Sequence, residues 1–252
     1  MNYGLYLSAS ALRVQEQRQE VIANNLANVN TPSFKRDLTV VRSRQSAPDE
    51  RNVPWYMTVP VLDDVRGGLR NGGTHTDFSQ AALLQTGQDL DVALQGEGFF
   101  SIEVDDQTQY TRDGRFAREP GTDYLITAAG RQRVLDETGE PIYLPAGEVN
   151  ITTRGTIFVN GERTAQLAVT RFTNPRDLRK VGQNAYSASP SAAKQPAGAL
   201  VRQKSVETSG VEPTKTLVRM LTAQRTYEAS AKMIQFADSM LGRAVNDIAR
   251  IV

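Results

Sequence analysis

Hydrophobic positions near the start of the chain follow a helical period. Between Leu5 and Val29, spacings of three and four residues alternate, which places one set of side chains on a single helix stripe. The stripe consists of Leu5, Ser8, Leu12, Gln15, Gln19, Ile22, Leu26 and Val29. Three of these eight side chains are polar, so a helix bearing them needs a packing partner to be stable in water. An Asn-rich segment followed by Thr31 and Pro32 ends the pattern, because Asn tolerates left-handed backbone and a residue before proline avoids the helical region.

The end of the chain carries the strongest periodic pattern. Spacings of three and four residues continue there over about five heptads. This second stripe consists of Leu217, Met220, Gln224, Tyr227, Ala231, Ile234, Asp238, Leu241, Val245, Ile248 and Val252. Pro213 suits a first helical turn, where its missing N–H costs nothing, and Glu212 suits the positive end of the helix dipole. We therefore predict a helix from about residue 213 onward, available as the partner of the first.

The middle of the chain alternates between apolar and polar residues, as strands do. Phe100, Ile102 and Val104 alternate with polar neighbours. Asn160-Gly161 and Asp113-Gly114 each lie between such segments, and each predicts a hairpin turn that uses positive φ. The glycines of Gly96-Glu97-Gly98 precede a strand and not a helix, so we expect them to permit close backbone packing, not to bind a nucleotide.

These patterns predict an α+β fold. The terminal α-helices pair as a coiled-coil-like layer, and a mainly antiparallel β domain is inserted between them. The predicted parts are an N-terminal helix with its signature (1–36), an irregular linker (37–73), a β-rich domain (74–204) and a C-terminal helix (205–252). The linker contains three prolines and two Gly-Gly pairs and shows neither period. Periodicity alone does not distinguish helices that pair within one chain from helices that pair between subunits.

Composition narrows the class of protein. The 252 residues include 29 basic and 28 acidic side chains, which disfavours an electrostatic nucleic-acid binder. The absence of cysteine excludes disulfides, thiolate metal sites and cysteine nucleophiles. No apolar run approaches the ~20 residues that span a bilayer, and the first residues do not have the pattern of a cleavable signal peptide.

Candidate chemistry is sparse. His75 is the only histidine, so no histidine pair can build a zinc site, and we expect this residue in a loop. No Gly-x-Ser-x-Gly segment exposes a serine nucleophile, and acidic pairs such as Asp105-Asp106 are expected to solvate turns. We predict no catalytic residues, no metal and no cofactor. The central arginines are interleaved with acidic residues, which predicts a solvated face; they are Arg112, Arg115, Arg118, Arg131 and Arg133.

Three blocks of sequence resemble the flagellar rod and hook proteins. The first is residues 21–32, VIANNLANVNTP, followed by Phe34, Lys35 and Arg36. The second comprises DLDVAL at 89–94, GEGFF at 96–100 and YTRDG at 110–114. The third comprises VETSGV at 206–211 and MLTAQRTYEA at 220–229. The chain departs from the family at Ser33 and Gly210, where the family usually has Gly and Asn.

The resemblance implies a structural subunit of the bacterial flagellar basal-body rod, more like the proximal than the distal rod. It implies polymerisation through the terminal helices with copies of the chain and other rod and hook-family subunits, and torque transmission from motor to hook. It also implies export through the flagellar type III apparatus without a cleavable signal. A protein of this kind is expected to bind no nucleic acid or small-molecule substrate and to catalyse no reaction. The expected assembly interface is Leu5, Leu12, Ile22, Leu26, Val29, Leu217, Met220, Tyr227, Ile234, Leu241, Val245 and Ile248. The alternative is a monomeric secreted β-domain binding module, or an adhesin-like protein, with a helical stalk.

Overall fold

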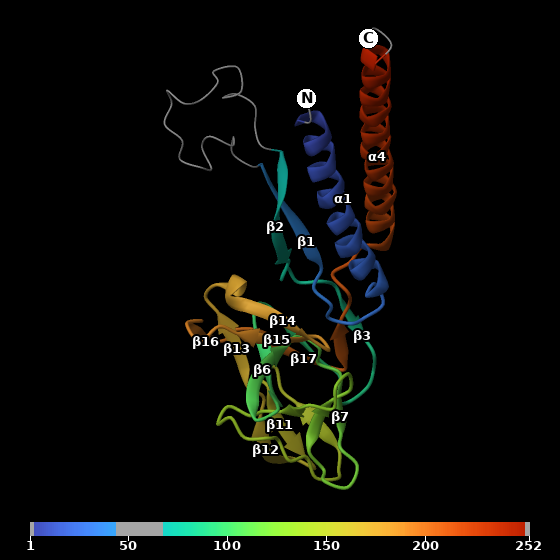
Figure 1. The fold of residues 1–252 in the computed structure, drawn as a ribbon. Coiled ribbons are helices and arrows are strands. Elements are labelled where there is room, and N and C mark those ends of the chain that lie inside the picture. Colours follow the sequence, from blue (N-terminus) through green and yellow to red (C-terminus); the bar gives the residue numbers. More distant parts are fainter. Residues whose placement is uncertain (1–2, 44–67, 250–252) are drawn as a thin grey trace. The chain divides into compact units, whose positions relative to one another are not determined.

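The chain folds into two compact units, whose parts alternate along the sequence (Figure 1). The computed structural model describes residues 3–43 and 68–249. The helical unit comprises residues 1–27, 37–75 and 212–252, and the β unit comprises 28–36 and 76–211. The fold class is α+β, as predicted, with one helix at each end of the chain and antiparallel strands between them. The division differs from the predicted one, because segments 28–36 and 205–211 belong to the β unit.

Two long helices form the helical unit. Helix α1 spans Tyr3–Ala27 and helix α4 spans Pro213–Ala249, so both predicted helices are confirmed. They lie side by side and run in opposite directions (Figure 1). Helix α4 begins at the proline, as its fixed φ and missing N–H favour. No helix among residues 3–27 and 213–249 is long and apolar enough to cross a membrane.

A two-stranded ribbon packs on α1 within the same unit. It is formed by β1 (Asp37–Ser43) and β2 (Leu69–Thr76), so the prediction of an irregular linker was wrong for these residues. Residues 44–67 of that predicted linker lie outside the described part. The sequence did not predict the ribbon, because β2 is almost entirely exposed. This strand also contains Gly72, where an added Cβ would lie 3.0 Å from the Val40 side chain. His75, expected in a loop, is also in β2.

The start of the ribbon is tied to α1 by one side chain. The amide of Asn25, which is buried, donates from Nδ2 to the Asp37 carbonyl oxygen at 2.7 Å. Its Oδ1 accepts from the Asp37 N–H at 2.9 Å. An amide can make both bonds at once because it carries a donor and an acceptor. This asparagine of the Asn-rich segment therefore fixes where the chain turns from helix to strand.

The β unit is built on antiparallel strand pairs. Its main sheet has the order β14-β15-β6-β5-β9-β8-β7, and β13 pairs with both β5 and β16. Smaller sheets are β10-β11-β12, β17-β4 and β18-β3. The strands are β3 Leu83–Gln85, β4 Val92–Gln95, β5 Phe99–Val104, β6 Gln107–Thr111, β7 Phe116–Arg118, β8 Leu125–Thr127, β9 Arg133–Val134, β10 Val149–Ile151, β11 Thr156–Val159, β12 Glu162–Gln166, β13 Val169–Phe172, β14 Leu178–Gly182, β15 Ala185–Ala188, β16 Lys194–Pro196, β17 Leu200–Gln203 and β18 Ser205–Glu207. A short 3-10 helix, η2 (Pro175–Asp177), precedes β14.

Two apolar clusters hold the β unit together. The larger gathers aliphatic side chains around Phe100, Ile102 and Leu94, all fully buried. The smaller is aromatic: Phe99 meets Phe172 and Tyr186 edge-on, with ring centroids 6.0 and 5.7 Å apart. Successive residues of β5 thus enter different clusters, so β5 is covered on both faces.

The turn predictions had different outcomes. Asn160-Gly161 joins β11 to β12 with φ values of 51° and 86°, which confirms that hairpin. Asp113-Gly114 is not a hairpin turn, because β6 pairs with β5 while β7 pairs with β8. Its glycine serves close approach instead, since a Cβ on Gly114 would lie 1.6 Å from the Val92 carbonyl oxygen. The hairpin between β5 and β6 turns at Asp105-Asp106, at φ values of 49° and 58°.

Candidate assembly interface

The predicted stripe of α1 is only partly buried. Ile22 is buried, whereas Leu5, Leu12 and Leu26 are half-buried. Val29 lies beyond the helix, in the β unit, and is also half-buried. Because most of its apolar side chains remain half-buried, this stripe can pack against a further helix.

The predicted stripe of α4 behaves similarly. Met220, Tyr227, Ile234 and Leu241 are half-buried on the side of α4 that packs on α1. Leu217 is 49% exposed and lies at the edge of this contact. The side chains of Val245 and Ile248 lie outside the described part. The two stripes thus meet within one chain.

The contact between the helices, which we call the seam, also contains small and polar residues. On α4 its most buried positions are Thr216 and Ala223. On α1 the Oε1 atom of Gln15 is buried without a hydrogen-bond partner among the described residues. Small residues let helices approach closely but contribute little apolar area, so most of the apolar contact in the seam comes from the half-buried residues of the two stripes.

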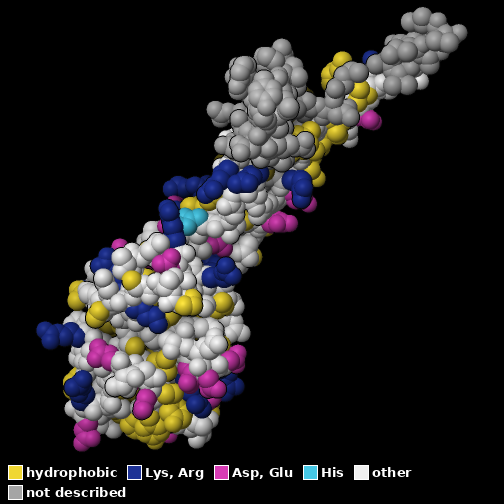
Figure 2. Space-filling model, turned by 60° about the vertical axis from the view of Figure 1, so that its left-hand side comes forward, with side chains coloured by type: hydrophobic (Ala, Val, Ile, Leu, Met, Phe, Trp, Pro, Cys, Tyr) yellow, Lys and Arg dark blue, Asp and Glu magenta, His cyan; other side chains and the backbone are white. Residues whose placement is uncertain are grey.

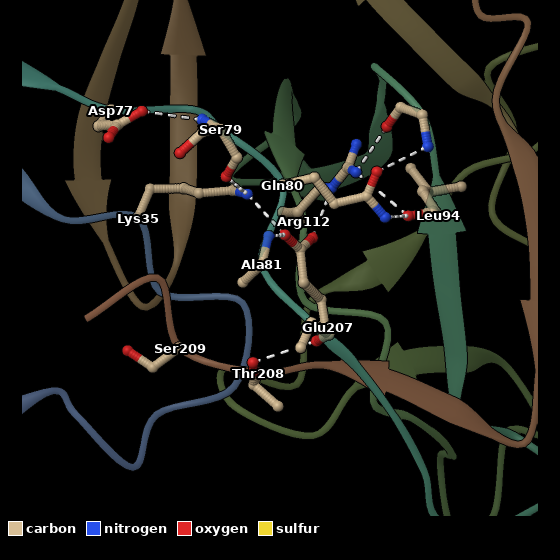
Figure 3. A network of polar contacts seen from close by, with 12 residues as sticks. Lys35, Asp77, Ser79, Gln80, Ala81, Leu94, Arg112, Glu207, Thr208 and Ser209 are labelled. Carbon is tan, nitrogen blue, oxygen red and sulfur yellow. Dashed lines mark hydrogen bonds and ion pairs between the residues drawn. The ribbon is translucent and has the colours of Figure 1, made fainter. Parts of the chain in front are cut away.

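A buried charge network lies in the β unit (Figure 3). Glu207, at the end of β18, accepts from Lys35 Nζ at 2.7 Å and from Arg112 Nε at 2.8 Å. All three side chains are at most 5% exposed. The Glu207 carboxylate also accepts from the backbone N–H of Ala81 at 2.7 Å. Paired and hydrogen-bonded charges of this kind avoid most of the penalty of burial, but removal of one partner leaves a buried charge unpaired.

Backbone carbonyls accept from further donors of the two cations. Lys35 Nζ donates to the Ser79 carbonyl oxygen at 2.8 Å. The Arg112 guanidinium donates to the carbonyl oxygens of Gly96, at 2.6 Å, and of Gly98. This explains the glycine segment that the sequence singled out: a Cβ on Gly98 would lie 2.9 Å from the Ala197 side chain, so its backbone packs closely, as expected.

The network lowers the pKa of the Glu207 carboxyl. Burial by itself would raise that pKa, because it disfavours the charged form. The charges of Lys35 and Arg112, with hydrogen bonds from Lys35 and Ala81, outweigh burial and hold the pKa below its ordinary value. Glu207 is therefore ionised at neutral pH, and its charge stabilises the fold.

The segment that follows α1 and the segment that precedes α4 lie together in the β unit. The Ser33 N–H donates to the Glu207 carbonyl oxygen at 2.8 Å, and the Gly210 N–H donates to the Phe34 carbonyl oxygen at 2.8 Å. Ser209 Oγ donates to the Asn28 carbonyl oxygen at 2.9 Å. Segments 28–36 and 207–211, which we call the connectors, are thus bonded to each other and, through the network, to the strands.

Two expectations about single residues need correction. Arg112, expected on a solvated face, is buried, because Glu207 and three carbonyl groups replace its hydration. Ser33 stands where the resemblance implies glycine, and it adopts φ 59° while fully buried. Its hydroxyl has no hydrogen-bond partner among the described residues. The substitution thus places strain at the connector of α1.

The described residues offer packing surfaces and salt bridges, not a constellation of reactive groups. A cavity of about 440 Å³ in the β unit is lined by Lys35, Arg112 and aromatic residues, but both cations are already paired. Across residues 3–43 and 68–249, no three His, Asp or Glu side chains come together as a metal site. Sequence reasoning missed the network because its members are 77 and 95 residues apart (112 − 35 and 207 − 112) and each looks like an ordinary surface charge.

Comparison with known proteins gives matches at both ends and in the middle of the chain. Residues 5–35 match the family "Flagella basal body rod protein", residues 93–159 match "Flagellar hook protein FlgE/F/G D1 domain", and residues 202–247 match "Flagellar basal body rod FlgEFG protein C-terminal". Each matched segment contains one member of the charge network.

Whole-chain relatives agree with these segments. The chain is 30% identical over 254 residues to the flagellar basal-body rod protein FlgF of Caulobacter vibrioides, with all of both chains covered. It is 31% identical to the rod protein FlgG of Borreliella burgdorferi, with 98% of each chain covered. It is also 31% identical to FlgG of Bacillus subtilis, with 96% of this chain and 97% of the relative covered.

Proposed function

Because the chain belongs to the flagellar basal-body rod protein family, we propose that it is a structural subunit of the rod that polymerises through its terminal helices. The observation that carries this proposal is the helix layer. Helices from opposite ends of the chain pair with each other, yet their stripes remain half-buried. Partly buried stripes favour further packing between subunits.

The proposed mechanism is mechanical. Torque passed along a rod must move from one subunit to the next through helix contacts and must not unfold the subunit. The connectors transmit mechanical load between the helices and the β unit. The buried network of Lys35, Arg112 and Glu207 holds them in place with charge-assisted hydrogen bonds. The proposed partners are copies of the chain and other rod and hook-family subunits. The relatives named above are all rod proteins, so an adhesin-like module has no support.

We further propose a place in the proximal rod, and export through the flagellar type III apparatus without cleavage. The first of these is supported by length: the match to FlgF extends over 254 residues, close to the 252 of this chain, whereas the match to FlgG of Borreliella burgdorferi extends over 267. Both are tested on isolated basal bodies. Position along the rod follows from labelled electron microscopy, and an intact first residue follows from N-terminal sequencing.

Deletion of residues 213–252 tests the proposed function. A strain that lacks the chain should regain motility and complete basal bodies from the full-length chain but not from the truncated one. The truncated protein should still show a cooperative urea transition of its β unit, because every strand and the network lie before residue 213. Assembly by the truncated chain would contradict a role of the helix layer. Loss of the cooperative transition would contradict the separation of assembly from folding.

A further inference from the structure

The cavity of about 440 Å³ in the β unit has the size and the lining of a ligand site. Its walls are aromatic: Phe99 and Phe172 are buried there, and Phe78 is half-buried. Glu97 and Arg171 are lining residues that are exposed, so the cavity has a mouth toward solvent on their side. Cavities that bind small molecules measure about 300–1,000 Å³ and combine apolar walls with a few polar groups. The buried polar groups of this cavity therefore indicate what it can bind.

Two buried cations at the cavity keep N–H donors that have no protein acceptor (Figure 3). The Lys35 ammonium has three donors, of which two go to Glu207 and to a backbone carbonyl. The Arg112 guanidinium has five donors, of which four go to Glu207 and to three backbone carbonyls. Each cation thus has one donor that no described residue accepts. Because buried donors are normally paired, a ligand with oxygen acceptors would complete both groups.

The buried network also carries an excess of positive charge. Lys35 and Arg112 contribute two positive charges, and Glu207 contributes a single negative one. The ion pair at the mouth, Arg171 with Glu97 at 2.8 Å, is balanced. On the face of the β unit drawn in Figure 2, basic and acidic side chains are interspersed as well. An uncompensated buried charge is costly, so the network favours one further negative charge.

The pKa of the Lys35 ammonium agrees with this excess. Burial has the largest influence and lowers that pKa, and the charge of Arg112 lowers it further. The charge and the hydrogen bond of Glu207 raise the pKa, but they do not outweigh burial, so it stays below its ordinary value. A second negative charge beside Lys35 would therefore stabilise its charged form.

We propose that this cavity binds a small organic monocarboxylate whose apolar body packs against the aromatic walls. The carboxylate supplies oxygen acceptors for the remaining donors of Lys35 and Arg112, and it supplies the negative charge that the network lacks. A neutral ligand brings no such charge, and a small hydrophilic acid leaves the aromatic walls uncovered. The cavity and the network lie wholly within the β unit, so this binding is separate from the proposed assembly through the helices.

Binding of phenylpropionate to the full-length protein tests the proposal. This probe has one carboxylate and one aromatic ring, and two matched probes each lack one of these features. Phenylpropionamide has no charge, and acetate has no apolar body. Isothermal titration calorimetry measures the affinities, and shifts of the Gly98 and Phe172 amide resonances in NMR spectra locate the site. Phenylpropionate should bind about tenfold or more tightly than either matched probe, as one charge-assisted hydrogen bond or the burial of one ring implies.

Two substitutions test the charge argument. Lys35→Met removes one cation and one donor while Arg112 stays paired with Glu207, so the acid and the amide should then bind equally well. Glu97→Gln removes a negative charge at the mouth from a side chain that is 76% exposed, so the fold should be kept. It should tighten binding of the acid by about two- to fivefold and leave the amide unchanged. Glu162→Gln is the matched control, because Glu162 is exposed on the β unit but does not line the cavity.

Each result supports or overturns the proposal. Equal binding of the acid and the amide by the wild type would overturn it, because the cavity would then recognise apolar bulk alone. It is also overturned if phenylpropionate shows no saturable binding, or if the shifted resonances lie away from the cavity. If Lys35→Met does not fold, Glu97→Gln decides: no difference from Glu162→Gln would contradict recognition by charge. None of these failures would affect the proposed role in the rod, since that role depends on the helices.

Discussion

Replacement of Glu207 by glutamine removes the negative charge of the buried network while keeping nearly the same shape. In the wild type this carboxylate accepts from Lys35, Arg112 and the Ala81 N–H at 2.7–2.8 Å. A glutamine keeps one accepting oxygen, but its NH₂ group now points a donor at a buried cation. Lys35 and Arg112 are then left as two buried positive charges with no counter-charge in contact.

The expected cost follows from burial. Because Glu207 and Lys35 are at most 2% exposed, solvent cannot replace the lost partner. Breaking a buried ion pair by removal of one member costs about 3–5 kcal/mol. With a urea dependence of about 2 kcal/mol per molar, the midpoint of unfolding should fall by about 2 M.

Urea unfolding followed by circular dichroism measures this shift, and Asp89→Asn provides the control. Asp89 pairs with Lys204 at 2.9 Å, but its side chain is 57% exposed and that of Lys204 is 50% exposed. Exposed pairs contribute at most about 1 kcal/mol. If Glu207→Gln lowers the midpoint no more than Asp89→Asn does, the network does not hold the connectors.

The stability of the protein at acid pH gives a second measure of the effect of the Glu207 charge. The pKa of Glu207 is lowered in the folded protein, so its stabilising contribution is fully present above the ordinary value of 4.5. It is lost as pH falls below 4.5 through the lowered folded pKa. The wild type should therefore lose more stability than Glu207→Gln over that range. Equal losses in both proteins would contradict the stated direction of the pKa.

Three further substitutions test single backbone positions in thermal or urea melts. Gly161→Val should destabilise the β unit by about 1 kcal/mol or more, because φ is 86° there and a β-branched residue resists it; an unchanged midpoint would count against the turn. Gly114→Ala should cost about 3 kcal/mol, since its Cβ would overlap the Val92 carbonyl oxygen; normal stability would show that this approach relaxes. Ser33→Gly should stabilise by about 1 kcal/mol, because it relieves a positive φ and removes a buried unpaired hydroxyl; a destabilised variant would reject that strain.

Features with local causes were the ones the sequence could predict. The periodic stripes and Pro213 located both helices, and Asn160-Gly161 located a hairpin, because spacing and allowed φ values act between near neighbours. The same local rule failed at Asp113-Gly114. There the glycine is required by a carbonyl of β4, twenty-two residues away (114 − 92), and a turn motif carries no sign of that contact.

Features with long-range causes needed the structure. Lys35, Arg112 and Glu207 come from three distant segments, so no spacing marks them as partners. The interface prediction chose the regular stripe of α4, where Tyr227 and Ile234 turn out to be half-buried toward α1. Only the position of α1 shows which side of the helix remains free.

The central claim is that this chain builds the rod through its terminal helices. A cryo-EM map of the isolated rod, resolved well enough to recognise side chains, tests it most directly. The account predicts that α1 and α4 of each copy line the tube as a pair, and that neighbouring copies contact each other through these helices. A rod without this chain, or one in which neighbouring copies touch only through their β units, would contradict it.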